Sequence, residues 1–138
     1  MDHSTIVTAV NEAVIDALGV EPEEVVPEAT LLDDLGAESI DLLDILFRLE
    51  RSLGIKIQAA ELAAHVQGGI PDEEFGDENE IVSAAGLAQL KKVMPQIDTA
   101  ELGGKLRATR VMGLFTVENL AGLVASRAEA DATAGIAA

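Results

Sequence analysis

The sequence predicts an all-α fold, and three observations support that class. Only 2% of the 138 residues are aromatic, so the core has to be built from Leu, Ile, Val and Ala side chains. Apolar residues recur every three or four positions in several stretches, which is the spacing of one helix face. Gly and Pro residues separate these stretches. A chain of this length forms one modest domain, in which helices pack on helices.

The first predicted helix begins at Ser4, a possible N-cap residue, and ends at Gly19. Ile6 and Val14 belong to its apolar face, together with residues three or four positions away from each. Residues 20–38 contain two prolines among many glutamates, so we expect a long acidic connection there and not a second helix.

The second predicted helix starts near Ser39 and ends at Gly54. Gly36 can end a turn without steric cost. Ser39 lies three residues later, and a run of apolar residues at helical spacing begins directly after it. Ser39 is therefore expected at a helix N-terminus that faces solvent. The polar face of this helix carries Asp41, Asp44, Arg48 and Arg51.

The middle of the chain contains one strong helical pattern, over residues 81–94, which Pro95 stops. Three shorter stretches, at residues 59–66, 70–74 and 98–102, are alternatives for a third helix of the bundle, and the first is favoured because it directly follows Ile57. A final helix starts after Thr116 and closes the bundle.

These patterns divide the chain into three parts. Residues 1–57 and 113–128 form the helical bundle. Residues 58–112 supply a third helix and an inserted helical segment, which has enough apolar surface to pack on the bundle. Residues 129–138 lose the apolar periodicity and are expected to be a flexible tail.

The net charge of −16 argues against nucleic-acid and membrane partners, because phosphate backbones and anionic lipids are bound through Lys and Arg. Residues 1–57 hold 13 acidic and 3 basic side chains, so the charge is concentrated around Ser39 and suits basic protein partners. No leader segment and no apolar run of about 18 residues is evident, and we expect a cytoplasmic monomer.

No set of residues predicts an enzyme. Ser39 has no base beside it, and His3 and His65 are single histidines far apart in the sequence. Residues 36–40 lack the flanking glycines of the hydrolase elbow, and the glycine of the acidic run 72–80 falls wrongly for a calcium loop. The chain also has no cysteine, so thioester chemistry would need the thiol of an attached cofactor.

Residues 34–41 read Asp-Leu-Gly-Ala-Glu-Ser-Ile-Asp, and this stretch resembles the modification motif of acyl carrier proteins. Two conservative changes separate it from the family pattern, Glu38 for Asp and Ile40 for Leu. The resemblance covers residues 4–57 and 113–127. It implies an acyl-carrier-like four-helix bundle, here with additional inserted helices.

The resemblance implies that Ser39 bears a covalent 4′-phosphopantetheine arm, which a phosphopantetheinyl transferase delivers from coenzyme A. The thiol of that arm would hold acyl groups for acyl-transferring or acyl-modifying enzymes with basic docking surfaces. Arg48 and Arg51 depart from the acidic or apolar helix of general carriers, so we expect a specialised fatty-acid, lipid or polyketide pathway. The residues expected to recognise partners are Glu38, Asp41, Asp44, Arg48 and Arg51.

Several alternatives stay open at this point. Leu43, Leu46 and Phe47 could line a space for the acyl chain, but residues at this spacing are more often plain core. Ser39 could be an ordinary N-cap. The chain could also be an aminoacyl or peptidyl carrier, or an acidic interaction module without a prosthetic group. The insert could enlarge the acyl cavity, cover it, or present a second partner surface.

Overall fold

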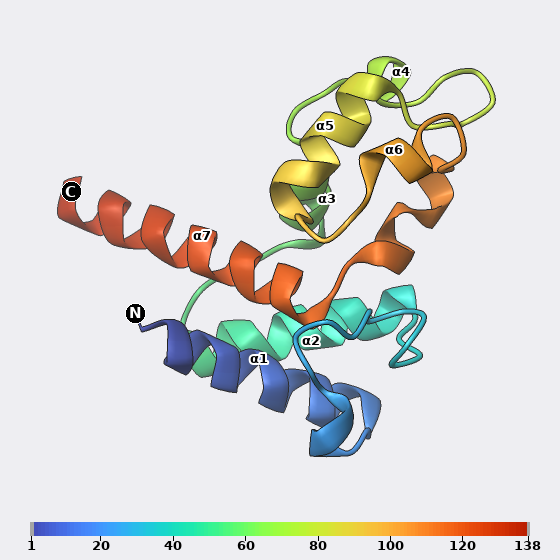
Figure 1. Ribbon diagram of the computed structural model, residues 1–138. Coiled ribbons are helices and arrows are strands. Elements are labelled where there is room, and N and C mark those ends of the chain that lie inside the picture. Colours follow the sequence, from blue (N-terminus) through green and yellow to red (C-terminus); the bar gives the residue numbers. More distant parts are fainter. Residues whose placement is uncertain (1, 138) are drawn as a thin grey trace.

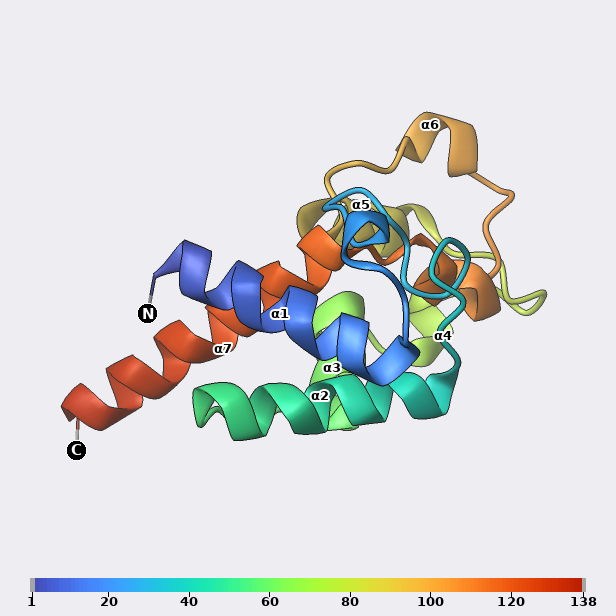
Figure 2. The ribbon, with the colours of Figure 1, turned by 90° about the horizontal axis from the view of Figure 1, so that it is seen from below.

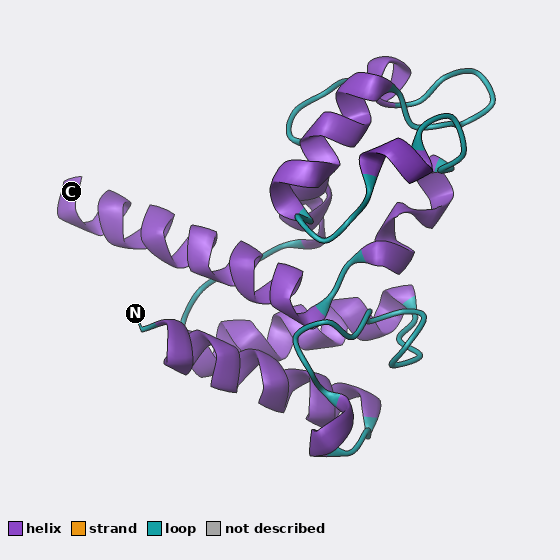
Figure 3. Ribbon diagram, in the orientation of Figure 1, coloured by secondary structure: helices purple, strands orange, loops and turns teal. Residues whose placement is uncertain are grey.

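The computed structural model describes residues 2–137, except for the side chains of Ser39, Ala59 and residues 129–137. Within that range the chain is helical, and strand-like pairing is limited to isolated bridges, which confirms the all-α class (Figure 3). The helices in chain order are α1 (His3–Leu18), η1 (Pro22–Glu24), α2 (Ser39–Leu53), α3 (Ala59–Gln67), α4 (Asp72–Phe75), α5 (Ala84–Val93), α6 (Thr99–Leu102), η2 (Ala108–Leu114) and α7 (Val117–Ala137).

The helices form two groups, which Figures 1 and 2 show from perpendicular directions. In the first group, α1 packs on both α2 and α7. In the second, α5 packs on α3, α4 and α6. The first group corresponds to the predicted bundle, and the second contains the predicted insert together with α3. All three short stretches proposed as a third helix are helical, as α3, α4 and α6.

The helix ends follow local sequence signals in most places. Gly54 ends α2 in the left-handed conformation, with φ of 70°, and its N–H donates to the carbonyl of Glu50 at 2.9 Å. The start of α1 corrects the expectation for Ser4. Asp2 occupies the N-cap position, and its carbonyl accepts the N–H of Ile6 at 3.1 Å, so Ser4 lies inside the first turn.

The helix predicted from residue 81 begins three positions later. Ser83 is the N-cap of α5, and its hydroxyl accepts the N–H of Gly86 at 3.1 Å. Ile81 and Val82 instead form β-bridges, with Arg107 and Gly76 respectively. Two successive β-branched residues suit this extended pairing better than a helix.

The last helix, α7, continues to Ala137, although the apolar periodicity predicts its end near Arg127. Alanine-rich sequence keeps a helical backbone without an apolar face, because alanine has the best intrinsic helix propensity. The predicted flexible tail, residues 129–138, lies outside the described side chains. Among the described helices, none combines the length and apolar character needed to cross a membrane.

The two groups of helices share one continuous apolar core. It includes fully buried side chains from α2, such as Leu49, and from the second group, such as Leu90 and Met94. Hydrogen bonds also join the groups. Nε2 of Gln96 donates to Oδ1 of Asn119 at 2.8 Å, and Nδ2 of Asn119 donates to Oε1 of Gln96 at 3.2 Å. The insert is therefore packed as part of the fold.

Candidate attachment site

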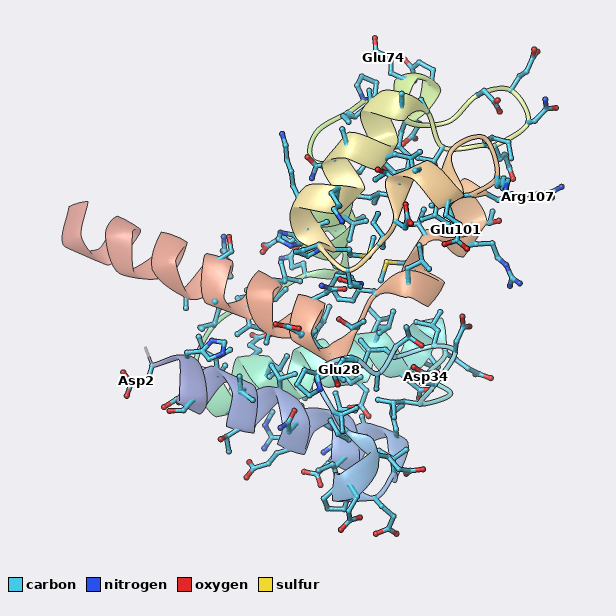
Figure 4. The ribbon with its side chains drawn as sticks, in the orientation of Figure 1. Asp2, Glu28, Asp34, Glu74, Glu101 and Arg107 are labelled. Atoms are coloured by element: carbon cyan, nitrogen blue, oxygen red, sulfur yellow. The ribbon has the colours of Figure 1, made fainter. Side chains whose placement is uncertain are left out.

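The loop before Ser39 is held by hydrogen bonds within itself. The N–H of Thr30 donates to Oδ2 of Asp34, and the N–H of Asp34 donates to Oγ1 of Thr30, each at 2.9 Å. The N–H of Leu35 also donates to the carbonyl of Thr30, at 3.1 Å. This reciprocal pairing closes a compact turn five residues before Ser39, with Asp34 on the surface (Figure 4).

The same loop is anchored to the far end of the chain. The N–H of Leu31 donates to the carbonyl of Phe115 at 3.0 Å, and Thr30 forms an antiparallel bridge with Thr116. The N–H of Ala37 donates to the carbonyl of Leu31 at 2.9 Å, and the side chains of both residues are buried. Ser39 therefore follows a backbone that is fixed two residues earlier.

Glu38, and not Ser39, holds the N-cap position of α2. The N–H of Glu38 donates to Oδ2 of Asp41 at 2.8 Å, and the carbonyl of Glu38 accepts the N–H of Asp41 at 3.0 Å. Ser39 is thus the first helical residue. The alternative that Ser39 is an ordinary N-cap is wrong, and its side chain lies outside the described ones.

A group attached at residue 39 has room on both sides. Ile40 is 70% exposed and Glu38 is exposed. Gly36 has φ of 75°, a conformation that glycine adopts easily, and a side-chain carbon placed there would have no neighbour within 4 Å. An anionic phosphodiester at a helix N-terminus is also favoured by the helix dipole, by about 0.3–1 kcal/mol. The site therefore fits a covalent phosphopantetheine arm.

The apolar residues of α2 lie on two opposite faces. Ile40, Leu43 and Phe47 are 70%, 51% and 56% exposed and form a row that we call the exposed stripe. Leu46 is only 3% exposed and belongs to the core. The interpretation of Leu43 and Phe47 as core is wrong, because positions 40, 43 and 47 lie on the helix side opposite to the buried residues Ile45 and Leu49. Their role in lining a space for the acyl chain stays a prediction.

The two arginines of α2 are engaged beside the stripe. Nε of Arg48 lies 3.1 Å from Oδ1 of Asp44, one helical turn away. The guanidinium of Arg51 lies 5.8 Å from the centre of the Phe47 ring, a cation–π distance. Glu38 and Asp41 form a capping box at the start of α2, and the two arginines lie closer to its C-terminal end. The N-terminal end of α2 is therefore more acidic than its C-terminal end.

The histidines are not gathered at this site. His3 is exposed at the start of α1, and His65 is half-buried on α3. Burial lowers the pKa of His65, because desolvation disfavours the charged imidazolium. In the acidic run 72–80, Oδ1 of Asp77 accepts the N–H groups of Asn79 and Ile81, which gives this carboxylate a structural role in a turn.

Sequence reasoning missed the exposed stripe, although the signal was present. Ile40, Leu43 and Phe47 follow a spacing of three and four residues, and Leu42, Ile45 and Leu49 follow the same spacing on the other face. A helix with two apolar faces has one that neighbouring helices leave uncovered.

Comparisons with known proteins agree with the geometry. The family model of the phosphopantetheine attachment site matches residues 8–67. An acyl carrier protein of Thermosynechococcus vestitus is 41% identical over 61 residues, which are 44% of this chain and 75% of the relative. Another, of Rubrobacter xylanophilus, is 39% identical with the same coverage. A third, of Thermotoga maritima, is 40% identical over 57 residues, or 41% of this chain and 70% of the relative.

No solved structure matches the chain significantly. The match to the family model ends at Gln67, the last residue of α3. The long acidic loop, the start of α2 and the modification motif all lie inside the matched range. The chain therefore belongs to the acyl carrier protein family, whose members are not enzymes but carriers that bear a covalent 4′-phosphopantetheine.

Proposed function

We propose that Ser39 bears the phosphopantetheine arm and that the protein carries acyl groups on it as thioesters. One observation carries the proposal: residue 39 opens α2 directly after a loop fixed to Phe115, and its neighbours Glu38 and Ile40 are exposed. An anchored backbone with open surroundings suits a residue that a transferase has to reach. The chain supplies the hydroxyl and the partner surface, and the transferase supplies the catalysis.

Intact-mass measurement tests the attachment residue. The protein is incubated with coenzyme A, Mg²⁺ and a phosphopantetheinyl transferase, and Ser39→Ala is compared with Ser52→Ala, an exposed serine on the same helix. Wild type and Ser52→Ala should gain the mass of one arm, and Ser39→Ala should gain nothing. A gain in Ser39→Ala, or no gain in any of the three, would contradict the proposal.

Partner enzymes dock, in this proposal, on the exposed stripe and the carboxylates of Glu38 and Asp41. Apolar side chains left in solvent beside a modification site supply contact area, and the carboxylates attract basic surfaces. Both features lie on the N-terminal half of α2, so a bound enzyme would have the thioester within reach.

The presence of Arg48 and Arg51 supports service in a specialised fatty-acid, lipid or polyketide pathway. A basic docking surface that is adapted to a uniformly acidic helix would be repelled by the positive charges of these two arginines. Purification of the carrier from its native cell, followed by mass spectrometry of the thioester, would identify the acyl class. An aminoacyl group there would contradict the acyl assignment. The cytoplasmic location and the monomeric state stay predictions.

A further inference from the structure

The second group of helices forms a cavity that is open to solvent on one side and separate from the modification motif. Its volume is about 410 Å³, within the range of about 300–1,000 Å³ that small-molecule pockets occupy. It lies between α3, α4 and η2. Its apolar lining consists of Ala63, Val66, Phe75, Ala108, Val111 and Met112.

The cavity walls are built and not loosely packed. Val66, Phe75 and Val111 are buried, one from each of the three helices. The carbonyl of Phe75 accepts the N–H of Ser83 at 2.8 Å. Nε2 of Gln67 donates to the carbonyl of Ile70 at 2.8 Å, which fixes the turn between α3 and α4. The space is therefore held open by paired backbone and buried side chains.

One wall of the cavity also touches the loop that leads to Ser39. Met112 lines the cavity, and the next residue, Gly113, packs on that loop. A side-chain carbon added at Gly113 would lie 3.2 Å from Oδ2 of Asp33. In Figure 1, η2 lies between α4 and the N-terminal end of α2. The end of η2 thus lies beside the loop that precedes Ser39, and the rest of η2 lines the cavity.

Three carboxylates stand at the polar side of this apolar space. Asp72, Asp77 and Glu80 are exposed lining residues, and the lining contains no Lys or Arg. Like charges that face a ligand disfavour it, although water and salt weaken the effect for exposed groups. The lining therefore favours an apolar chain over one that ends in a carboxylate.

We propose that this cavity takes the distal, apolar part of an acyl chain carried on the protein's own arm, provided that the chain has no acidic end. The proposal rests on the proposed function, since the arm at Ser39 delivers the chain. It gives the insert a role in the choice of cargo. Val66, Phe75, Val111 and Met112 are the residues that the chain would contact.

Methyl NMR of the intact loaded protein tests the site. The protein is labelled at its methionine methyl groups and loaded by a phosphopantetheinyl transferase from butyryl-, dodecanoyl- or ω-carboxydodecanoyl-coenzyme A, and intact mass verifies each load. With dodecanoyl, the Met112 methyl signal should shift more than with butyryl and show an NOE to chain methylenes. Met94, buried elsewhere in the core, should not respond. With the ω-carboxy chain, the Met112 methyl signal should match that of the butyryl-loaded protein and show no NOE to the chain.

Two variants on α3 provide the matched control. Ala63 lines the cavity, and the adjacent Ala64 is exposed but does not line it. Ala63→Phe should abolish the dodecanoyl-dependent shift of Met112, and Ala64→Phe should keep it, with both variants loaded to the same extent.

The outcomes separate the two proposals. Loading without a Met112 NOE, or an equal NOE from the ω-carboxy chain, would overturn the cavity assignment and leave the carrier function intact. No mass gain at all would overturn both.

Discussion

The two groups of helices in this carrier differ in what they present to solvent. The group of α1, α2 and α7 positions Ser39. Around that residue its surface carries the acidic side chains of Glu38 and Asp41 and the apolar side chains of the exposed stripe. The group of α3 to α6, with η2, contains an apolar cavity that is open to solvent on one side. The family model matches residues 8–67, which contain most of α1 and all of α2 and α3, whereas α4 to α7 and η2 lie beyond it. In this molecule the residue proposed to bear the arm and the cavity proposed for the cargo lie in different groups of helices.

The largest test asks whether the two groups unfold as one body. Leu49 in α2 and Leu90 in α5 are both fully buried in the same core cluster. Each Leu→Ala change should lower the free energy of unfolding by about 2–5 kcal/mol, because it removes buried apolar surface and leaves a cavity. Urea unfolding followed by circular dichroism should show one transition for both variants. Two separate transitions in Leu90→Ala would mean that the insert is an independent domain.

The next test concerns the exposed stripe. Phe47→Ser should reduce kcat/KM for loading by the transferase about tenfold, since a central apolar contact of an interface contributes on the order of 1–2 kcal/mol. Stability should change little, because the ring is 56% exposed. Val26→Ser is the control, an exposed apolar residue on the α1–α2 loop. Equal rates for the two variants would remove the stripe from the docking surface.

A smaller effect is expected where the groups are joined. Gln96→Ala removes the hydrogen bonds that its side chain makes to Asn119 and to the carbonyl of Leu114. The free energy of unfolding should fall by about 1 kcal/mol, the usual net value of such bonds. Gln58→Ala, at the N-cap of α3 where no side-chain cap bond forms, should cost less in the same urea titration. An equal loss would show that the Gln96 bonds add nothing to the junction.

The smallest effect is a pH dependence at His65. Burial lowers its pKa in the folded chain, so the unfolded chain binds more protons as the pH falls through the ordinary value near 6.5. The contribution of the neutral His65 side chain to the free energy of unfolding is fully present above that pH and is lost as the pH falls below it. Between pH 7.5 and 5.5 the wild type should lose more unfolding free energy than His65→Gln. Parallel pH profiles would rule out this contribution.

Much of the first group could be predicted from the sequence. Regular apolar spacing with Gly19 and Gly54 at the ends marks α1 and α2, and the motif around Ser39 marks the site. These signals depend only on residues that are close together in the sequence, so they can be recognised without knowledge of the tertiary structure. The sequence also indicates that the insert packs on the bundle, because its apolar residues have no other place to be buried.

The remaining features depend on tertiary contacts. The exposure of Leu43 and Phe47 is set by which face of α2 meets α1, and both faces are apolar. Ile81 and Val82 leave the helical pattern because Arg107 and Gly76 are there to pair with them. The cavity is lined by α3, α4 and the more distant η2, and no local sequence pattern describes a space between packed helices.

The backbone pairing of Thr30 and Leu31 with Thr116 and Phe115 has a consequence for the order of events during synthesis. The helices α2 and α3 and the whole insert lie between these partners in the sequence, and contacts of such high sequence separation are slow to form. A chain still on the ribosome cannot complete the base of the Ser39 loop until Thr116 has emerged. The loop before Ser39 therefore reaches its folded form only after the helices between these two segments have been synthesised.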